Sequence, residues 1–409
     1  MATPSQRVST TIRISSLFLL LPILLSFLHK SFVKALSRTP CLITIYYDSS
    51  NVLHRCPSYH PEQPLRISVC VERLKQEQSG YYELYDVSSS LTFDELKISR
   101  SILSQVHSEE YVHKLEHKCR TSREARLAQG KDPLGFIGYV DEGDTYVTTE
   151  SYDVCLRATA IWIRAVHHVL HQQQQQTTPL ISLALTRPPG HHATKNLANG
   201  FCIFNFCASA VLHAIHVLRQ QPNPTTKNNP RVSVLDWDVH YGQGTADILQ
   251  HIPEVRYVSI HQTPAFPYMG QTRSISGPHK NIFTIPIVAE TSWEGGYKDR
   301  YENLALPFIA NEEDWLPDII IISAGYDALD SDPLASVSLN PNDYEKMVHS
   351  LHRHLARCFQ GKQQLPAIVL GLEGGYQLQK DGNGLDEAVL ATVKALVDIT
   401  VSSTEDSHH

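Results

Sequence analysis

The segment Val232-Ser233-Val234-Leu235-Asp236-Trp237-Asp238-Val239-His240 places two acids and an imidazole at the end of a short apolar run. Side chains of an extended segment alternate between two faces, so Asp236, Asp238 and His240 are expected to point the same way. Burying two carboxylates and an imidazole is costly without a positive partner, and a metal ion supplies that charge. The segment therefore predicts a metal site at the end of a buried strand. The alternative is a strand end with solvated acids.

Six further apolar runs read as strands: LITIYY (42–47), SLAL (182–185), VRYVSI (255–260), IFTIPI (282–287), DIIIIS (318–323) and AIVLGL (367–372). Helical candidates lie at 201–218, 244–251, 296–310, 342–359 and 385–401. Strands that are apolar throughout are typical of a parallel sheet covered on both faces. The alternation of strands and helices predicts an α/β fold, a three-layer sandwich around a mostly parallel central sheet. Its site should lie in the loops at the carboxyl ends of the strands.

The composition excludes several classes of protein. The chain has 409 residues, of which 42% are hydrophobic and 19% charged, so it is not a mostly disordered chain. A net charge of −7 argues against direct binding of nucleic acid through charge. The 22 histidines favour a metal or acid–base site, and the eight cysteines form no CxxC pair, which argues against a cysteine-rich zinc site. Their spacing leaves disulfide pairing open.

The N-terminus differs from the rest. Residues 14–28 (ISSLFLLLPILLSFL) carry no charge, Arg7 and Arg13 precede them, and Val33-Lys34-Ala35 offers small side chains for cleavage. Residues 1–35 therefore read as a signal or targeting segment, with an uncleaved anchor as the main alternative and a false start of translation or a buried helix as the third. This leader predicts the secretory route or an organelle, such as a plastid. Any membrane contact would come only through residues 14–28. Residues 401–409 read as a flexible tail.

A second apolar strand, 318–323, leads into Asp327. A lone Asp after a strand is often only a turn or a helix cap, but here it completes a set with Asp238 and His240. Three ligands with one position left open for water are typical of catalytic zinc. Ligands of this type also suit Fe(II) or Mn(II).

Two more strands end in residues suited to catalysis. The strand at 182–185 leads through Pro and Gly to His191 and His192, which beside a metal fit a general base and a general acid, although tandem histidines are also common on surfaces. Asp236 is then free to orient one imidazole. The strand at 367–372 leads to Glu373-Gly374-Gly375-Tyr376, where the Tyr376 hydroxyl either packs or donates to an oxyanion.

Taken in order, these motifs resemble the histone deacetylase superfamily, which has the arginase/deacetylase fold. The resemblance spans about 43–399 and also rests on Leu53-His54, HPEQPLR (60–66), HSEEYV (107–112) and Asp144-Thr145-Tyr146. The segments DWDVH (236–240) and LEGGY (372–376) are closer to class II-like and bacterial members. The resemblance implies a catalytic domain over 42–400, zinc-dependent hydrolysis of N-acetyl amides, most of all acetyl-lysine in proteins, and a role in chromatin regulation.

The resemblance also implies roles for individual residues. Zinc would be held by Asp238, His240 and Asp327, with His191, His192, Asp236 and Tyr376 as catalytic residues. Substrate contacts would come from Phe201 and Phe266 in a narrow apolar tunnel, from Asp144 at the rim and from Arg66 in an inner pocket. Gly200 and Leu334 would also contact the substrate. A structural potassium ion would be held by Asp236, Asp238, His240, Ser259 and Ile260.

The chain departs from the family pattern at three positions. Tyr241 replaces a common His, and Gln243 replaces a common Asp or Asn, which weakens the partner of His192. Leu334 stands where polyamine-selective members carry Glu, which disfavours the alternative of an amidohydrolase acting on acetylpolyamines. Further alternatives are an inactive binding or scaffold protein and a binuclear manganese enzyme related to arginase. The family implies nucleus or cytoplasm, in conflict with the leader, and the sequence makes no prediction about oligomeric state.

Overall fold

The computed structural model describes residues 43–405 except 58, 78, 141, 142, 144, 173–179, 221–228, 363 and 380. The predicted leader, Asp144 and the last four residues of the chain lie outside this part. Among the described helices, none combines the length and hydrophobicity needed to span a bilayer. The seven cysteines in the described part are all unpaired, so no disulfide joins them to one another.

A nine-stranded sheet forms the centre of the fold, in the order β2-β1-β5-β11-β10-β6-β7-β9-β8. Neighbouring strands run parallel except β8 and β9, which are antiparallel. All seven strands predicted from the sequence are present, each ending within two residues of its expected bounds. The strands are β1 (Ile43–Tyr47), β2 (Tyr82–Asp86), β5 (Ile181–Leu185), β6 (Val232–Asp236), β7 (Val255–Gln262), β8 (Ser274–Ser276), β9 (Ile282–Ile287), β10 (Ile319–Ala324) and β11 (Ala367–Leu372), with a separate antiparallel pair, β3 (Phe136–Tyr139) and β4 (Tyr146–Thr148).

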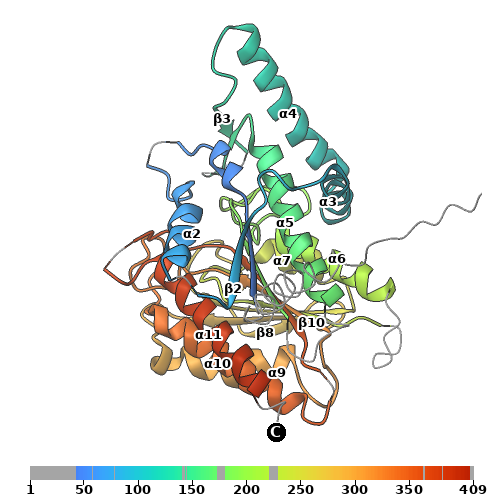
Figure 1. The fold of residues 1–409 in the computed structure, drawn as a ribbon, viewed down its shortest axis with the longest axis vertical. Helices are drawn as coiled ribbons and strands as arrows, with labels where there is room; N and C mark the ends of the chain where they lie inside the picture. Colours follow the sequence, from blue (N-terminus) through green and yellow to red (C-terminus); the bar gives the residue numbers. More distant parts are fainter. Residues whose placement is uncertain are drawn as a thin grey trace, which may run out of the picture. The chain divides into compact units, whose positions relative to one another are not determined.

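Helices cover both faces of this sheet (Figure 1). One face packs against α2 (Leu65–Glu77), α10 (Pro341–Cys358), α11 (Leu385–Glu405) and a broken helix made of η4 (Trp293–Tyr297), α8 (Lys298–Arg300), η5 (Tyr301–Ala305) and α9 (Leu306–Ile309). The other packs against α3 (Phe93–Val106), α4 (Glu109–Ala128), α5 (Ser151–Gln172), α6 (Phe206–Gln220) and α7 (Gln243–Leu249), and a short turn, η2 (Ser49–Leu53), follows β1. The predicted three-layer α/β sandwich is therefore confirmed.

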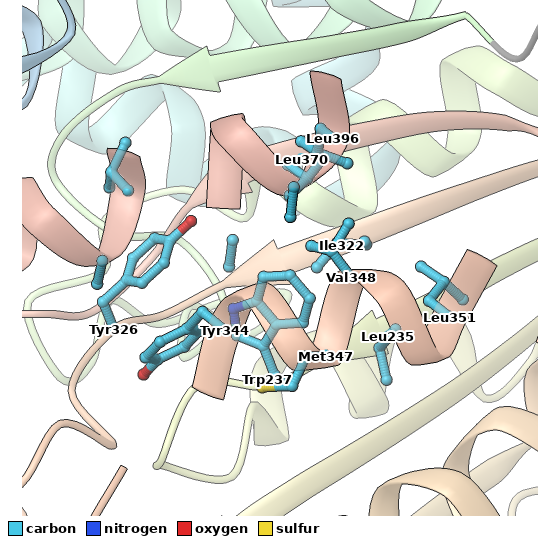
Figure 2. Close-up of a cluster of buried hydrophobic side chains, with 14 of the residues drawn as sticks. Leu235, Trp237, Ile322, Tyr326, Tyr344, Met347, Val348, Leu351, Leu370 and Leu396 are labelled. Carbon is cyan, nitrogen blue, oxygen red and sulfur yellow. The ribbon is translucent and has the colours of Figure 1, made fainter. Parts of the chain in front are cut away.

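Successive side chains of the central strands point to opposite faces of the sheet, and this produces two hydrophobic cores. In β10, Ile320 and Ile322 face one core while Ile319 and Ile321 face the other. Figure 2 shows the first core, where strand residues such as Leu235, Ile322 and Leu370 meet side chains of α10 and α11. Because side chains of a strand alternate with period two, an all-apolar run buries both of its faces.

Several helix predictions need correction. The helix expected from residue 201 begins at Phe206, because Gly200 and Phe201 have φ of 52° and 68°, a left-handed backbone that cannot start a helix. The helix expected over 296–310 is interrupted by wide π-type turns, and Gly296 within it has φ of 131°. The last helix runs to Glu405, so the stretch expected to be a flexible tail from 401 begins as helix.

A buried ion pair ties the loop after β5 to the N-terminal part of the domain. Arg187 donates from Nε and Nη2 to both carboxylate oxygens of Glu62, at 2.7 and 2.6 Å, and the Tyr146 hydroxyl donates to the same carboxylate at 2.6 Å. Arg187 also donates to the carbonyls of Asn51 and His54. Burial alone would raise the pKa of Glu62, but the guanidinium facing it lowers that pKa to about 2. This paired, bidentate arrangement holds the start of the loop that carries His191.

Replacing Glu62 with Gln should reduce the free energy of unfolding by about 3–5 kcal/mol at pH 7, because Arg187 would stay buried without its counter-charge. The folded-state pKa of Glu62 lies below its ordinary value of 4.5, so its contribution is complete above pH 4.5 and is lost as the pH falls towards 2. Chemical denaturation of wild type and variant between pH 7 and pH 2.5 should show the difference shrinking with acid. Glu116→Gln, at a carboxylate that is 42% exposed, is the control and should change little. A difference that does not vary with pH would contradict this account.

Candidate active site

The residues predicted to carry chemistry follow four neighbouring strands, β5, β11, β10 and β6. Because these strands are parallel, their carboxyl ends meet at one edge of the sheet. Open α/β sheets bind their ligands at this edge, outside the strand ends. The structure thus brings together segments that lie far apart in the sequence.

Asp238, His240 and Asp327 converge at this edge. Their potential ligand atoms all lie within 4.8 Å of one another, and all three side chains are buried. The Nδ1 atom of His240 is 3.0 Å from Oδ2 of Asp327 and 3.3 Å from Oδ1 of Asp238. The structure therefore assembles the set of metal ligands expected from the sequence.

Backbone amides hold the two carboxylates in place. Asp238 accepts from the amides of Gly374 at 2.7 Å and His240 at 2.9 Å, and Asp327 accepts from the amide of Val239 at 2.9 Å. A Cβ atom added to Gly374 would lie 2.0 Å from Oδ2 of Asp327 and 2.5 Å from Oδ2 of Asp238. Only glycine lets the loop after β11 approach both acids this closely.

The charge balance of this cluster fits a bound cation. Asp236, Asp238 and Asp327 are fully buried, and within the described part their only ion-pair partners are the imidazoles of His191 and His240. Burial by itself lowers the pKa of His240, but its hydrogen bonds to Asp238 and Asp327 raise that pKa well above the ordinary value. A divalent ion would neutralise these buried acids, and one nitrogen with two oxygen ligands suits zinc.

The carboxylate of Asp236 holds the imidazole of His191 in place. Its Nδ1 lies 3.1 Å from Oδ2 of Asp236, and that oxygen also accepts from the Tyr257 hydroxyl at 2.7 Å. Burial lowers the pKa of His191, but the charges of Asp238 and Asp236 outweigh burial and raise it to about 10. The arrangement favours a positively charged imidazole with its Nδ1 proton directed at Asp236, as expected for an orienting acid.

His192 has a neutral partner instead. Its Nδ1 lies 2.6 Å from Oε1 of Gln243, whose amide nitrogen donates to the His192 carbonyl at 3.2 Å. Burial, followed by the charges of His191 and His240, lowers the pKa of His192 well below its ordinary value. The ring centres of His191 and His192 are 4.0 Å apart. The pKa values of the two histidines are therefore shifted in opposite directions, raised for His191 and lowered for His192.

Tyr376 lies on the loop after β11, two residues beyond Gly374, whose amide binds Asp238. Burial raises the pKa of its hydroxyl well above the ordinary value, so it remains a donor. Its backbone amide donates to Oδ2 of Asp332 at 2.7 Å, and the guanidinium carbon of Arg66 lies 4.8 Å from its ring centre. Arg66 is buried and donates to the carbonyls of Gly375, at 2.8 Å, and Glu373, so it supports the loop on which Tyr376 lies.

Two aromatic residues flank these groups. The ring centres of Phe266 and His192 are 4.9 Å apart, and those of Phe201 and Tyr376 are 5.5 Å apart. Gly200, with φ of 52°, passes so close that an added Cβ would lie 2.6 Å from Cδ2 of His192 and 2.7 Å from Cε1 of Phe266. Phe266 and Phe201 thus lie beside His192 and Tyr376, and their role as tunnel walls stays a prediction.

Leu334, Asp144 and the residues of the potassium site were also predicted from the sequence to take part in substrate or ion binding. Leu334 lies in the loop after β10, is 40% exposed and donates from its amide to Oδ1 of Asp332 at 2.9 Å. Asp144 lies outside the described residues. In the predicted potassium site, Asp236 pairs in register with Ser259, whose hydroxyl lies 2.9 Å from Nδ1 of His261. The potassium ion stays a prediction, made for Asp236, Asp238, His240, Ser259 and Ile260.

Three supporting residues were not predicted from the sequence. Glu373 accepts from the amides of Gly190 at 2.6 Å and His191 at 3.1 Å, which clamps the histidine loop. Its position directly after a buried strand was an available signal. Tyr257, which binds Asp236, and Asp332, which binds the Tyr376 amide, had no signal in the local sequence, because only the folded chain brings them to their partners.

Comparison with known proteins agrees with this geometry. A family model described as the histone deacetylase domain matches residues 60–393. The chain belongs to the histone deacetylase superfamily. An uncharacterized protein of Synechocystis sp. is 34% identical over 357 residues, covering 87% of this chain and 100% of that protein. Histone deacetylase 14, chloroplastic, of Arabidopsis thaliana is 27% identical, covering 86% of this chain and 76% of that protein.

A solved structure shares the fold of this histone deacetylase family member. The crystal structure of the HDA15 HD domain matches with a TM-score of 0.67 at 24% sequence identity, covering 88% of this chain and 90% of that one. The predicted arginase/deacetylase fold is confirmed, and the chain is a hydrolase of the deacetylase family.

Gly200→Ala should disturb the site of this deacetylase, whereas Gly361→Ala should not. Both glycines have a positive φ, of 52° and 75°, but a Cβ at position 361 meets nothing within 4 Å. Both variants should lose about 1–2 kcal/mol of folding free energy from backbone strain, and Gly200→Ala should lose roughly 1–3 kcal/mol more because it displaces His192 and Phe266. Denaturation curves and kcat/KM measure both effects. Equal losses in the two variants would contradict the close packing at Gly200.

Proposed function

We propose that this chain hydrolyses the N-acetyl amide of acetyl-lysine side chains in proteins, using one zinc ion held by Asp238, His240 and Asp327. The strongest support is the convergence of these three buried side chains, with ligand atoms within 4.8 Å of one another, beside a histidine pair. Three ligands leave a coordination position open for substrate or water. When bound there, zinc would polarise the acetyl carbonyl and lower the pKa of the attacking water.

His192 is placed to take the proton from the attacking water. It donates its Nδ1 proton to the amide oxygen of Gln243, which leaves the lone pair of Nε2 free. Burial and the neighbouring imidazoles keep its pKa low, so the ring is neutral and able to accept a proton. The same ring can then pass that proton to the departing lysine amine.

His191 has a different task. Asp236 lies against its Nδ1 and holds the ring in one orientation. A polar group fixed beside the reacting carbonyl stabilises the negative charge that develops during attack. Asp236 serves as the residue that orients this ring.

Tyr376 would provide further electrostatic support for the oxyanion that forms on the acetyl group. Its protonated hydroxyl can donate to the developing oxyanion, and its loop is held by Asp332 and Arg66. Phe201 and Phe266 would contact the aliphatic chain of the substrate, because each ring lies next to a reacting residue. A long apolar chain with a terminal amide suits these surroundings.

The proposed substrate is acetyl-lysine rather than an acetylpolyamine. A polyamine keeps further positive charges along its chain and needs counter-charges at the entrance. Leu334, 40% exposed, offers none at the position where polyamine-selective members carry Glu. An acetyl-lysine side chain has no such charge, so an apolar residue there is compatible with it.

Tyr376→Phe should lower kcat on an acetyl-lysine peptide by about 10²–10³, because one oxyanion donor is lost. Tyr326→Phe is the matched control, since that buried hydroxyl donates to Thr392 at 3.3 Å instead. Zinc content, measured by elemental analysis, should be the same in both variants and in wild type. Turnover like wild type in Tyr376→Phe would overturn the role of this residue. A wild-type protein that binds the peptide without releasing acetate would favour the inactive-scaffold alternative.

Leu334→Glu should increase kcat/KM for an acetylpolyamine by roughly fivefold, which corresponds to about 1 kcal/mol from an exposed ion pair. Leu334→Gln has a similar shape without the charge and should not show the increase. Side-by-side assays with acetylpolyamine and acetyl-lysine peptide measure the change in preference. A wild-type enzyme that already prefers the acetylpolyamine would contradict the proposed substrate.

A further inference from the structure

Helix α5 packs against α6 (Figure 1), and four histidines lie on these two helices. His167 and His171 lie in the last turns of α5, and His213 and His216 lie in α6. The last turns of α5 precede the amino end of β5, whereas the active-site loop leaves the carboxyl end of that strand. The cluster therefore belongs to a separate region of the fold.

The spacing of the rings suits shared coordination. His167 and His171 are four residues apart on one helix face, and their ring centres are 4.0 Å apart. The ring centres of His167 and His213 are 6.0 Å apart. Three imidazoles around one tetrahedral zinc ion, at the usual zinc–nitrogen distance, would have ring centres about 5 Å apart. One of these two distances is shorter than that spacing and the other is longer, so shared coordination would require the side chains to rotate.

A buried nitrogen in the cluster lacks a partner. His213 is 9% exposed, and within the described part of the chain its Nε2 has neither solvent contact nor a hydrogen bond. Buried polar atoms in native proteins nearly always have a partner. A ligand bound by this imidazole would remove the cost of leaving the ring unsatisfied.

The local charges also favour a cation. Burial, followed by the neighbouring histidines, lowers the pKa of His213 to about 4, and burial and His171 lower that of His167. Neutral imidazoles are the form that binds metal. Arg164, one turn before His167, is neutralised by two hydrogen bonds of 2.7 Å to Glu95. The guanidinium of Arg164 is therefore already paired.

We propose that His167, His171 and His213 form a second metal site, which binds a divalent transition-metal ion such as zinc and joins α5 to α6. Imidazole ligands suit zinc, copper and nickel. Two ligands come from one helix and the third from its neighbour, so the bound ion would stabilise the packing of this helical layer. The site is independent of the proposed catalytic zinc.

The test is the zinc content of the full-length protein after removal of metal with a chelator and dialysis against low micromolar zinc. Wild type should hold two zinc ions per chain and His167→Gln/His171→Gln one. His113→Gln/His117→Gln is the matched control, because it removes another pair four residues apart, with ring centres 6.1 Å apart, and should leave two. His167 and His171 are exposed, so their replacement should preserve the fold, which circular dichroism checks.

A thermal measurement gives a second readout. The rise in Tm on adding zinc should be larger in wild type than in His167→Gln/His171→Gln by about 5 °C. Equal zinc content and equal rises in Tm would overturn the second site. If the catalytic zinc proposal fails instead, wild type would hold one ion and the double variant none, so the two failures can be told apart.

Discussion

The burial of carboxylates at one edge of an apolar sheet is the constraint on which the rest of this structure depends. Asp236, Asp238, Asp327 and Glu373 are all fully buried, and within the described residues their partners are imidazoles, hydroxyls and backbone amides rather than lysine or arginine. Such a cluster is stable only if each oxygen is satisfied and positive charge is brought in. Both needs are met by loops that leave neighbouring parallel strands.

These loops are held more firmly than surface loops usually are. The loop that carries the histidine pair is anchored at one end by Arg187 against Glu62 and further along by Glu373 against two backbone amides. The loop that carries Tyr376 is held by Arg66 and Asp332. Chemistry that depends on distances of about 3 Å needs this fixed geometry, because small displacements cost large factors in rate.

Neighbouring charges and burial also distinguish the histidines of the two histidine-rich regions. In the candidate active site, the charges of Asp238 and Asp236 raise the pKa of His191, while Gln243 gives His192 a neutral partner. Between α5 and α6, burial and the neighbouring histidines lower the pKa of His213, and no acid among the described residues offsets them. Identical side chains thus have pKa values shifted in opposite directions, and the difference arises from their neighbours.

The sequence by itself determined the central strands and pointed to the acids and imidazole of a candidate metal site, because apolar runs of β-length and an acid–x–acid–x–His pattern depend only on local periodicity. It did not yield α2, α3, α4 and α5. Helix α4 buries only Val112, Leu115 and Cys119, so its apolar signal is weak. For α3 a signal was available, because Thr92 and Glu95 form a capping box at its start.

Only the tertiary structure decided the rest: the late start of α6 after Gly200 and Phe201, the pairing of Tyr257 with Asp236, and the meeting of His167 with His213. Each of these depends on residues distant in the chain, and their contact is set by how strands and helices pack, which local patterns do not encode.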